Sequence, residues 1–271
     1  MTMWTKLTAA TFGAMLIAGG AAAQSCSDGK TLTEGKLTIA TGNPAYYPWV
    51  IDDAPESGKG FEAAVAYALA EAMGFATEDV VWTRTSFDQA IQPGAKDFDI
   101  NMQQFSITAE RDKVVDFSAP YYTAPMAVLV RGGGDLSASL DALKELKWGV
   151  VASTTALPMI TDTIQPASSP LVYDDNANVV EAMKAGQVDA ALFDLPTALY
   201  LSAVVLEGGQ VLGQFLPDET ANPDHFGALM PEGSPLKECV DAALAELKAD
   251  GALAALEAEW LQEATGVPLI E

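Results

Sequence analysis

Four polar residues in this chain each follow a predicted strand, at the kind of position where open α/β sheets bind their ligands. They are Asn43, Gln104, Ser153 and Asp194. The carboxyl ends of parallel strands border a crevice, and side chains that follow those ends reach into it. Amide, hydroxyl and carboxylate groups in such a crevice hold a polar molecule by hydrogen bonds and opposite charge. The sequence alone therefore makes each of these residues a candidate for ligand binding.

The chain lacks the residue sets that usually carry catalysis or hold a metal. His225 is the single histidine, predicted to lie in a loop near a crossing between domains, and Cys26 and Cys239 stand far apart. No Gly-x-Ser-x-Gly elbow, phosphate loop or dinucleotide fingerprint is present. Paired acids for glycoside chemistry remain open, since 37 Asp and Glu residues are available and nothing singles out a pair. We expect no catalytic residue, no metal and no cofactor.

Alternating strands and helices must position these candidates. The predicted strands cover residues 37–40, 80–82, 98–102, 126–130, 147–151, 171–173, 188–193 and 226–230. Apolar residues at helical spacing fill the segments between several of them, as from Phe61 to Met73. Ser153 to Thr155 offers a helix start, and Pro196 opens the helix after Asp194. This alternation predicts an α/β fold with parallel sheets and helices on both faces.

The N-terminal residues predict export. Lys6 precedes an apolar stretch at 7–20, and three alanines at 21–23 give a cleavage pattern, so 1–23 is predicted to be a signal peptide. The chain has a net charge of −23, from 14 Lys and Arg against 37 Asp and Glu. So acidic a protein repels nucleic acid and anionic membranes, and neither is an expected partner.

Cys26 and Cys239 would meet an oxidising compartment after export. We expect them to form a disulfide that ties the N-terminal segment to a C-terminal helix. The alternative is a pair of separate buried thiols.

Residues 104–122 contain the most informative pattern. It reads Ser106-Ile-Thr-Ala-Glu-Arg111, then Val115-Asp-Phe-Ser-Ala-Pro-Tyr-Tyr122. With Gly60-Phe61-Glu62, the segment 188–190 followed by Asp194, and the closing pattern up to Trp260, it resembles the polar amino-acid family of periplasmic substrate-binding proteins. The resemblance covers residues 37–260. It implies a type II periplasmic-binding-protein fold, with lobe 1 at 33–124 plus 226–271, lobe 2 at 125–225, and two hinge crossings.

The resemblance also implies a site for a zwitterion. Arg111 matches the residue that binds the ligand carboxylate, for which a guanidinium is the planar two-pronged partner. Ser106 matches a hydroxyl donor beside it, Thr155 a donor at a helix start, and Asp194 the acid that binds the ammonium. Without the family pattern, Arg111 between Glu110 and Asp112 would indicate a surface ion pair. Ser106 could simply satisfy a turn, and Thr155 or Asp194 could simply cap a helix.

Four further residues match or depart from the family pattern. Tyr46 matches an aromatic residue that packs on the ligand, and Phe87 lies near another, with ordinary core packing as the alternative. Gln104 replaces a small residue and could reach into the pocket. Asn43 replaces an aspartate, which disfavours a cationic ligand side chain because that side chain would need a buried counter-charge.

The resemblance therefore implies a monomeric periplasmic component of an ABC-type importer, which captures a neutral polar or small apolar amino acid for an inner-membrane permease. No reaction is expected. Two alternatives stay open: a periplasmic accessory or sensor protein of the quinoprotein-associated type, and a dehydratase-like enzyme on the same fold.

Overall fold

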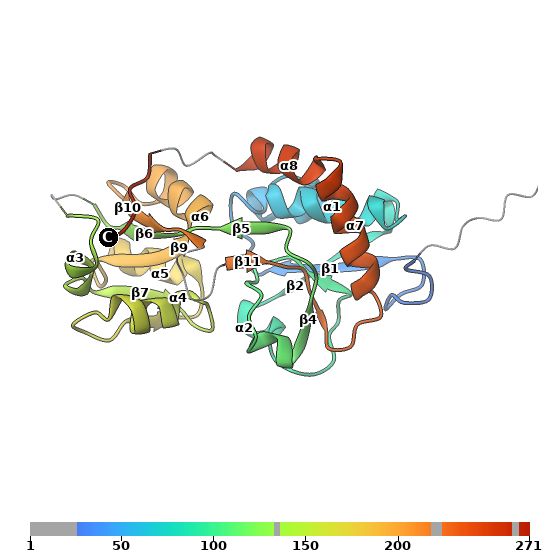
Figure 1. The fold of residues 1–271 in the computed structure, drawn as a ribbon, viewed down its shortest axis with the longest axis horizontal. Helices are drawn as coiled ribbons and strands as arrows, with labels where there is room; N and C mark the ends of the chain where they lie inside the picture. Colours follow the sequence, from blue (N-terminus) through green and yellow to red (C-terminus); the bar gives the residue numbers. More distant parts are fainter. Residues whose placement is uncertain (1–25, 133–135, 218–223, 262–265) are drawn as a thin grey trace, which may run out of the picture.

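The computed structural model describes residues 26–132, 136–217, 224–261 and 266–271, so the predicted signal peptide lies outside the described residues. Within them the chain forms two α/β halves, each built around a five-stranded sheet (Figure 1). The first sheet has the order β2-β1-β3-β12-β4, with β1 Leu37–Gly42, β2 Val80–Thr85, β3 Ile100–Asn101, β4 Val115–Phe117 and β12 Leu229–Pro231. The second has the order β10-β6-β9-β7-β8, with β6 Met126–Val130, β7 Trp148–Val151, β8 Leu171–Tyr173, β9 Ala190–Asp194 and β10 Gln210–Phe215.

A third, two-stranded sheet joins the halves. Strands β5 (Tyr122–Ala124) and β11 (Asp224–Phe226) pair antiparallel and run between the two larger sheets (Figure 1). His225 lies on β11, where its Nδ1 is 2.8 Å from the Thr123 hydroxyl oxygen. The histidine is therefore near the crossing, as predicted, but in a strand instead of a loop.

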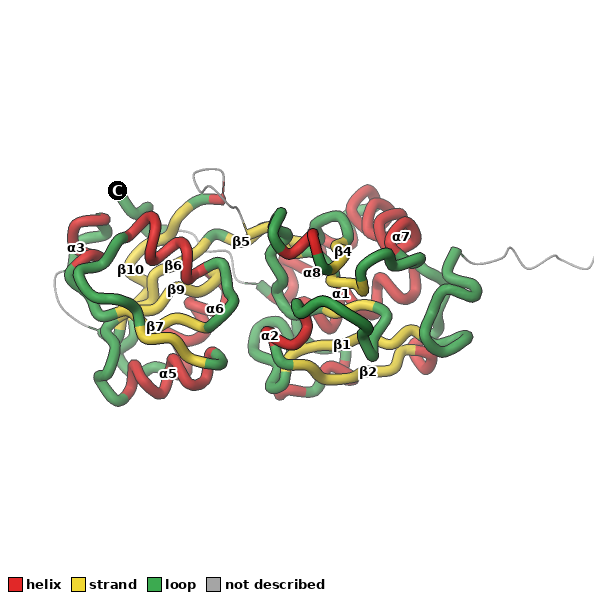
Figure 2. The backbone as a smooth tube through the Cα atoms, turned by 90° about the horizontal axis from the view of Figure 1, so that it is seen from below, coloured by secondary structure: helices red, strands yellow, loops and turns green. Residues whose placement is uncertain are grey.

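Helices cover both large sheets. Those of the first half are α1 Phe61–Ala72, α2 Phe87–Ala90, α7 Lys237–Ala249 and α8 Ala252–Trp260. Those of the second half are α3 Leu140–Lys144, α4 Ala156–Pro158, α5 Asn176–Lys184 and α6 Leu195–Tyr200, with π-helical turns at Met159–Ile164 and Leu201–Val205. Figure 2 shows the same two halves from below, with β5 between them. No helix in the described ranges is both long enough and apolar enough to cross a membrane.

The expectation of parallel sheets needs correction, because both sheets are mixed. Strand β1 is parallel to β2 and β3, but β12 runs antiparallel to β3 and β4. In the second sheet, β6 is antiparallel to β9 and β10. The parallel pairs come from strand–helix–strand units, whereas β6 and β12 enter their sheets directly from the crossing strands and run the opposite way.

The end of the chain departs from the expected lobe boundaries. Leu269 forms a bridge with Gln214 on β10, and Ile270 packs against the apolar core of the second half. The Leu140 amide donates to the carbonyl of Glu271, 2.8 Å away. The last residues thus pack on the second half, although we expected all of 226–271 in lobe 1; Figure 1 shows the C-terminus there.

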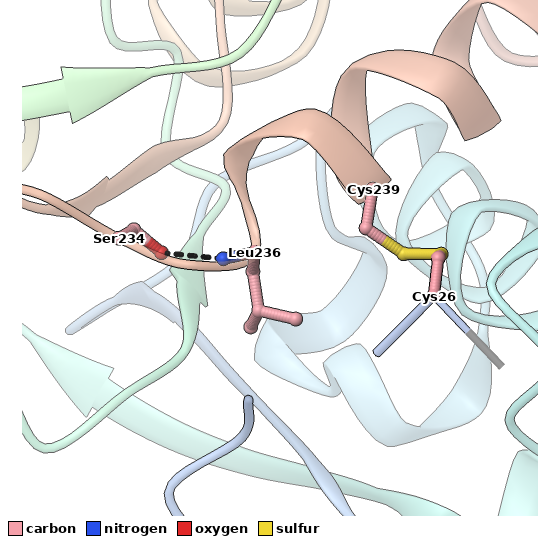
Figure 3. Close-up of a disulfide and its surroundings, with 4 residues drawn as sticks. All are labelled: Cys26, Ser234, Leu236 and Cys239. Carbon is pink, nitrogen blue, oxygen red and sulfur yellow. Dashed lines mark hydrogen bonds between the residues drawn. A yellow bond between two sulfur atoms is a disulfide. The ribbon is translucent and has the colours of Figure 1, made fainter. Parts of the chain in front are cut away.

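The predicted disulfide between Cys26 and Cys239 is confirmed, with Cα atoms 5.7 Å apart (Figure 3). Cys239 is buried on the first turn of α7, and in the loop before this helix the Ser234 hydroxyl accepts a hydrogen bond from the Leu236 amide. The bond therefore anchors the N-terminal segment to the helical layer of the first half.

Replacing both cysteines with serine should lower the free energy of unfolding by about 3–5 kcal/mol, because the bond closes a very long loop in the unfolded chain. Urea unfolding of the oxidised protein and the double variant measures this difference. Two free thiols in unfolded, unreduced protein would contradict the pairing.

Candidate functional site

One cavity of about 220 Å³ is lined from both halves and from the crossing strand β11. Its walls include all eight residues predicted to bind the ligand: Asn43, Tyr46, Phe87, Gln104, Ser106, Arg111, Thr155 and Asp194. A volume below the roughly 300–1,000 Å³ of drug-sized sites suits a small molecule. Ser153, the remaining candidate from strand ends, instead contacts the site through its backbone carbonyl.

Arg111 begins the short 3₁₀ helix Arg111–Lys113, and its side chain turns inward. The residue is only 8 % exposed, and its guanidinium donates to the carbonyls of Ser106 and Ser153 at 2.7 and 2.8 Å. Glu110 pairs with Lys113 instead, so the surface ion pair suggested by the local sequence is absent. The guanidinium also lies 5.3 Å from the centre of the Phe87 ring, within range of a cation–π contact.

The charge of Arg111 has no ion-pair partner within 4.0 Å among the described residues. Burial lowers its pKa to about 10, an effect that the charge of Asp224 partly offsets. The group thus stays protonated near neutral pH. Since two of its five N–H groups are used by carbonyls, others remain for an anion.

Asp224 is the site residue that the sequence analysis missed. It is buried at the start of β11, and its Oδ1 accepts hydrogen bonds from the hydroxyls of Ser106 (2.6 Å) and Thr155 (2.8 Å). Burial raises its pKa, while these two bonds and Arg111 act in the opposite direction. The available signal was an acid two residues before the predicted strand at 226–230, close to a predicted crossing.

Asp194 ends β9 and caps α6, where its carboxylate accepts the amide hydrogen of Thr197 at 2.8 Å. The Thr197 hydroxyl in turn accepts a buried hydrogen bond from the Trp49 indole, 2.8 Å away in the other half. Burial raises the pKa of Asp194 to about 6, against the lowering effect of Thr197. Capping and binding are compatible here, because one carboxylate oxygen caps while the residue also lines the cavity.

Aromatic rings form part of the wall. Phe87 stacks on Phe105 with ring centres 4.6 Å apart, so it both lines the cavity and packs on the core. The Tyr46 hydroxyl is buried, with the backbone amide of Ala177 beside it. Burial, with the nearby charge of Asp175, raises the pKa of Tyr46 to about 12, which keeps this donor protonated.

Gln104 lines the cavity, but its side-chain amide does not extend freely into it. Both this amide and the backbone N–H of Gln104 donate hydrogen bonds to the carboxylate of Glu62, at the start of α1. The bond from the backbone N–H is 2.7 Å long. The Tyr121 hydroxyl donates to the same carboxylate. These bonds to Glu62 hold Gln104, which has a left-handed backbone conformation (φ 51°), at the cavity wall.

Glu62 should make the protein less stable as pH rises. Burial raises its pKa to about 7 from 4.5, although hydrogen bonds from Tyr121 and Gln104 oppose this. An acid with a raised pKa favours the folded state in its protonated form, so stability is lost as pH rises from about 4.5 through about 7. The unliganded protein should unfold at lower urea concentration at pH 8 than at pH 5, and Glu62→Gln should reduce that difference. Equal midpoints at both pH values for the wild type would contradict this account.

Contacts between the halves flank the cavity. The Ser153 hydroxyl donates to Asp88 at 2.7 Å, and the rings of Tyr47 and Tyr200 lie 4.1 Å apart at their centres. With the Trp49–Thr197 bond, they join the first half to the second around the cavity. The structure thus shows the two halves closed on each other.

The lining is strongly asymmetric in charge. Arg111 is the one cation among the described residues that line the cavity, and four carboxylates accompany it: Asp174, Asp175, Asp194 and Asp224. A buried cation without an ion partner and separate carboxylates can hold the two ends of a dipolar molecule.

Two α/β halves that close over a polar cavity at a two-stranded crossing define a two-lobed solute-binding protein. The comparisons agree: the family described as bacterial extracellular solute-binding proteins, family 3, matches residues 37–263. The chain belongs to this family.

Three named proteins show how similar this chain is to its relatives. The L-cystine-binding protein TcyJ of Escherichia coli is 28% identical over 254 residues, covering 91% of this chain and 92% of the relative. A solved ancestral arginine-binding protein bound to arginine has a TM-score of 0.70 and 28% identity, covering 84% of this chain and 99% of that chain. An ancestral amino-acid-binding protein described as a precursor of cyclohexadienyl dehydratase has a TM-score of 0.67 and 29% identity, over 84% and 96% of the two chains.

Proposed function

We propose that this protein captures a small amino acid in the periplasm and delivers it to an inner-membrane ABC permease, as a monomer that opens and closes around two crossings. The observation that carries the proposal is that Arg111 and Asp194, from opposite halves, line one small cavity. The arginine suits the ligand's carboxylate, and the aspartate suits its ammonium. The amino-acid-binding relatives support the same class of ligand.

The lobes that move would be 33–124 plus 226–261, and 125–225 together with residues 267–271, which pack on the second half. A ligand held by groups from both lobes favours the closed state, because it binds that state more tightly than the open one.

Asn43 is a weaker guide to the ligand's side chain than the sequence suggested. It lines the cavity, but so do Asp174 and Asp175, which could serve as counter-charges for a basic side chain. We keep a neutral polar or small apolar amino acid as the proposal and include basic amino acids in its test.

The direct experiment is mass spectrometry of small molecules released from the purified protein, together with thermal-shift assays of the twenty amino acids. Stabilisation by one or a few of them is the expected result. Incubation with prephenate-like compounds tests for an enzyme instead, and turnover would overturn the binding-protein proposal.

A further inference from the structure

The crossing strand β11 carries a carboxylate into the part of the cavity where a ligand carboxylate is proposed to bind. Asp224 is 4 % exposed, and one of its oxygens accepts both the Ser106 and the Thr155 hydroxyl hydrogen bonds. These hydroxyl oxygens lie 3.4 Å apart and come from opposite halves of the molecule. A hydroxyl has one proton to donate, so both donors are already committed.

Ser106 and Thr155 are the hydroxyls that the family pattern assigns to the ligand. In this structure Asp224 holds them, and the charge of Arg111 also acts on Asp224. A ligand carboxylate brought to Arg111 would therefore enter a site that already contains an anion and whose two hydroxyl donors point to that anion.

Two carboxylates that share one site do not both ionise readily, because each raises the pKa of the other. The charged and titratable groups that act on Asp224 are Arg111 from the 3₁₀ helix, His225 from its own strand and Asp194 from β9. Among the described residues that line the cavity, Arg111 is the single cation beside these two carboxylates before any ligand arrives.

We propose that Asp224 is a specificity-determining residue that makes binding of a ligand carboxylate conditional on the uptake of one proton by Asp224. Protonation removes the resident negative charge, gives Asp224 a hydrogen to donate, and frees the Ser106 and Thr155 hydroxyls to turn toward the ligand. One proton from solvent is bound for each amino acid bound. This inference rests on the proposed function, because it assumes a ligand with a carboxylate at Arg111.

The sign of the pH effect follows from the added anion, which raises the pKa of Asp224 in the complex above that in the free protein. Affinity is full below the free-protein pKa and falls by up to about tenfold per pH unit until the pKa in the complex is passed. Asp194 contributes little to this change above pH 7, because its pKa of about 6 leaves it ionised there.

The experiment uses each of the twenty L-amino acids, first in thermal-shift assays at pH 7 and pH 8 with the wild type, Asp224→Asn and Asp174→Asn. Asparagine keeps the shape and an acceptor oxygen but no charge, and Asp174 is a matched carboxylate on the same cavity wall. Every amino acid that stabilises a protein is then titrated calorimetrically in two buffers of different ionisation enthalpy, which counts protons.

For wild type we expect a dissociation constant several-fold higher at pH 8 than at pH 7, with close to one proton taken up. Asp174→Asn should show the same pH dependence and the same proton uptake as wild type, whatever its affinity for a given amino acid. Asp224→Asn should bind more tightly than wild type at pH 8, with little pH dependence and little proton uptake.

Amino-acid binding by wild type with no proton uptake and no pH dependence overturns the inference and leaves the proposed function intact. The number of protons taken up by the wild type tests the inference even if Asp224→Asn fails to fold. If no amino acid binds any of the three proteins, the proposed function fails and the inference fails with it.

Discussion

Arg111→Met should weaken amino-acid binding by at least about a hundredfold while the protein remains folded. Methionine fills much of the same volume but offers no positive charge, so the ligand carboxylate would be buried without a partner. Breaking a buried charge pair by removing one member costs about 3–5 kcal/mol. That corresponds to roughly a hundredfold to a few thousandfold in the dissociation constant. Isothermal titration with an amino acid identified by the thermal-shift panel measures the loss.

Two companion variants separate this role from a structural one. Arg111→Lys keeps the charge but lacks the fork that could reach the carbonyls of Ser106 and Ser153 together with a ligand, so it should bind with intermediate affinity. Arg131→Met removes an exposed arginine outside the cavity and should leave affinity unchanged. If Arg111→Met bound the same amino acid as tightly as wild type, Arg111 would be removed from the site.

Some strands could be predicted from the local sequence, and others could not. The predicted segments 126–130 and 171–173 coincide with β6 and β8, because dense runs of apolar or β-branched residues indicate a strand locally. Strands β4, β5, β10 and β11 were not predicted as such. Strands β5 and β11 have three residues each and gain their partner only when the two crossings meet in space, and the pairing of β10 is interrupted by a register shift between Val211 and Gly213. Whether β6 and β12 run parallel or antiparallel to their neighbours likewise depends on where the chain crosses between the two halves, which the local sequence does not show.

The same distinction between local and spatial information applies to the site. The motif around Arg111 and the strand before Asp194 identified residues that the structure brings to one cavity wall. Neither Asp224 nor the Glu62–Gln104 bond could be read from spacing, because each joins residues more than forty positions apart in the chain. Burial is what turns these carboxylates from ordinary surface acids into groups with raised pKa values.

Asp194→Asn should weaken amino-acid binding strongly and at the same time stabilise the unliganded protein at neutral pH. The ammonium of the ligand would lose its carboxylate partner, whereas Asn remains a good helix N-cap for α6. Burial raises the pKa of Asp194 to about 6 from 3.8, so its ionised form is disfavoured in the folded protein. Stability is therefore lost as pH rises from about 4 to about 6, and the variant should avoid a penalty on the order of 1–3 kcal/mol at pH 7.

The measurement compares an amino acid with its deaminated analogue, which keeps the carboxylate and lacks the ammonium. Wild type should prefer the amino acid by a large factor, about a hundredfold if the buried pair is worth roughly 3 kcal/mol. Asp194→Asn should lose most of that preference while its thermal unfolding temperature rises.

Asp175→Asn is the matched control, since Asp175 caps α5 through the Asn178 amide and lines the same cavity. It removes the same charge, and it should retain the preference for the amino acid. An unchanged preference in Asp194→Asn would show that the ammonium binds elsewhere, and the dipolar site argued from Arg111 and Asp194 would have to be abandoned.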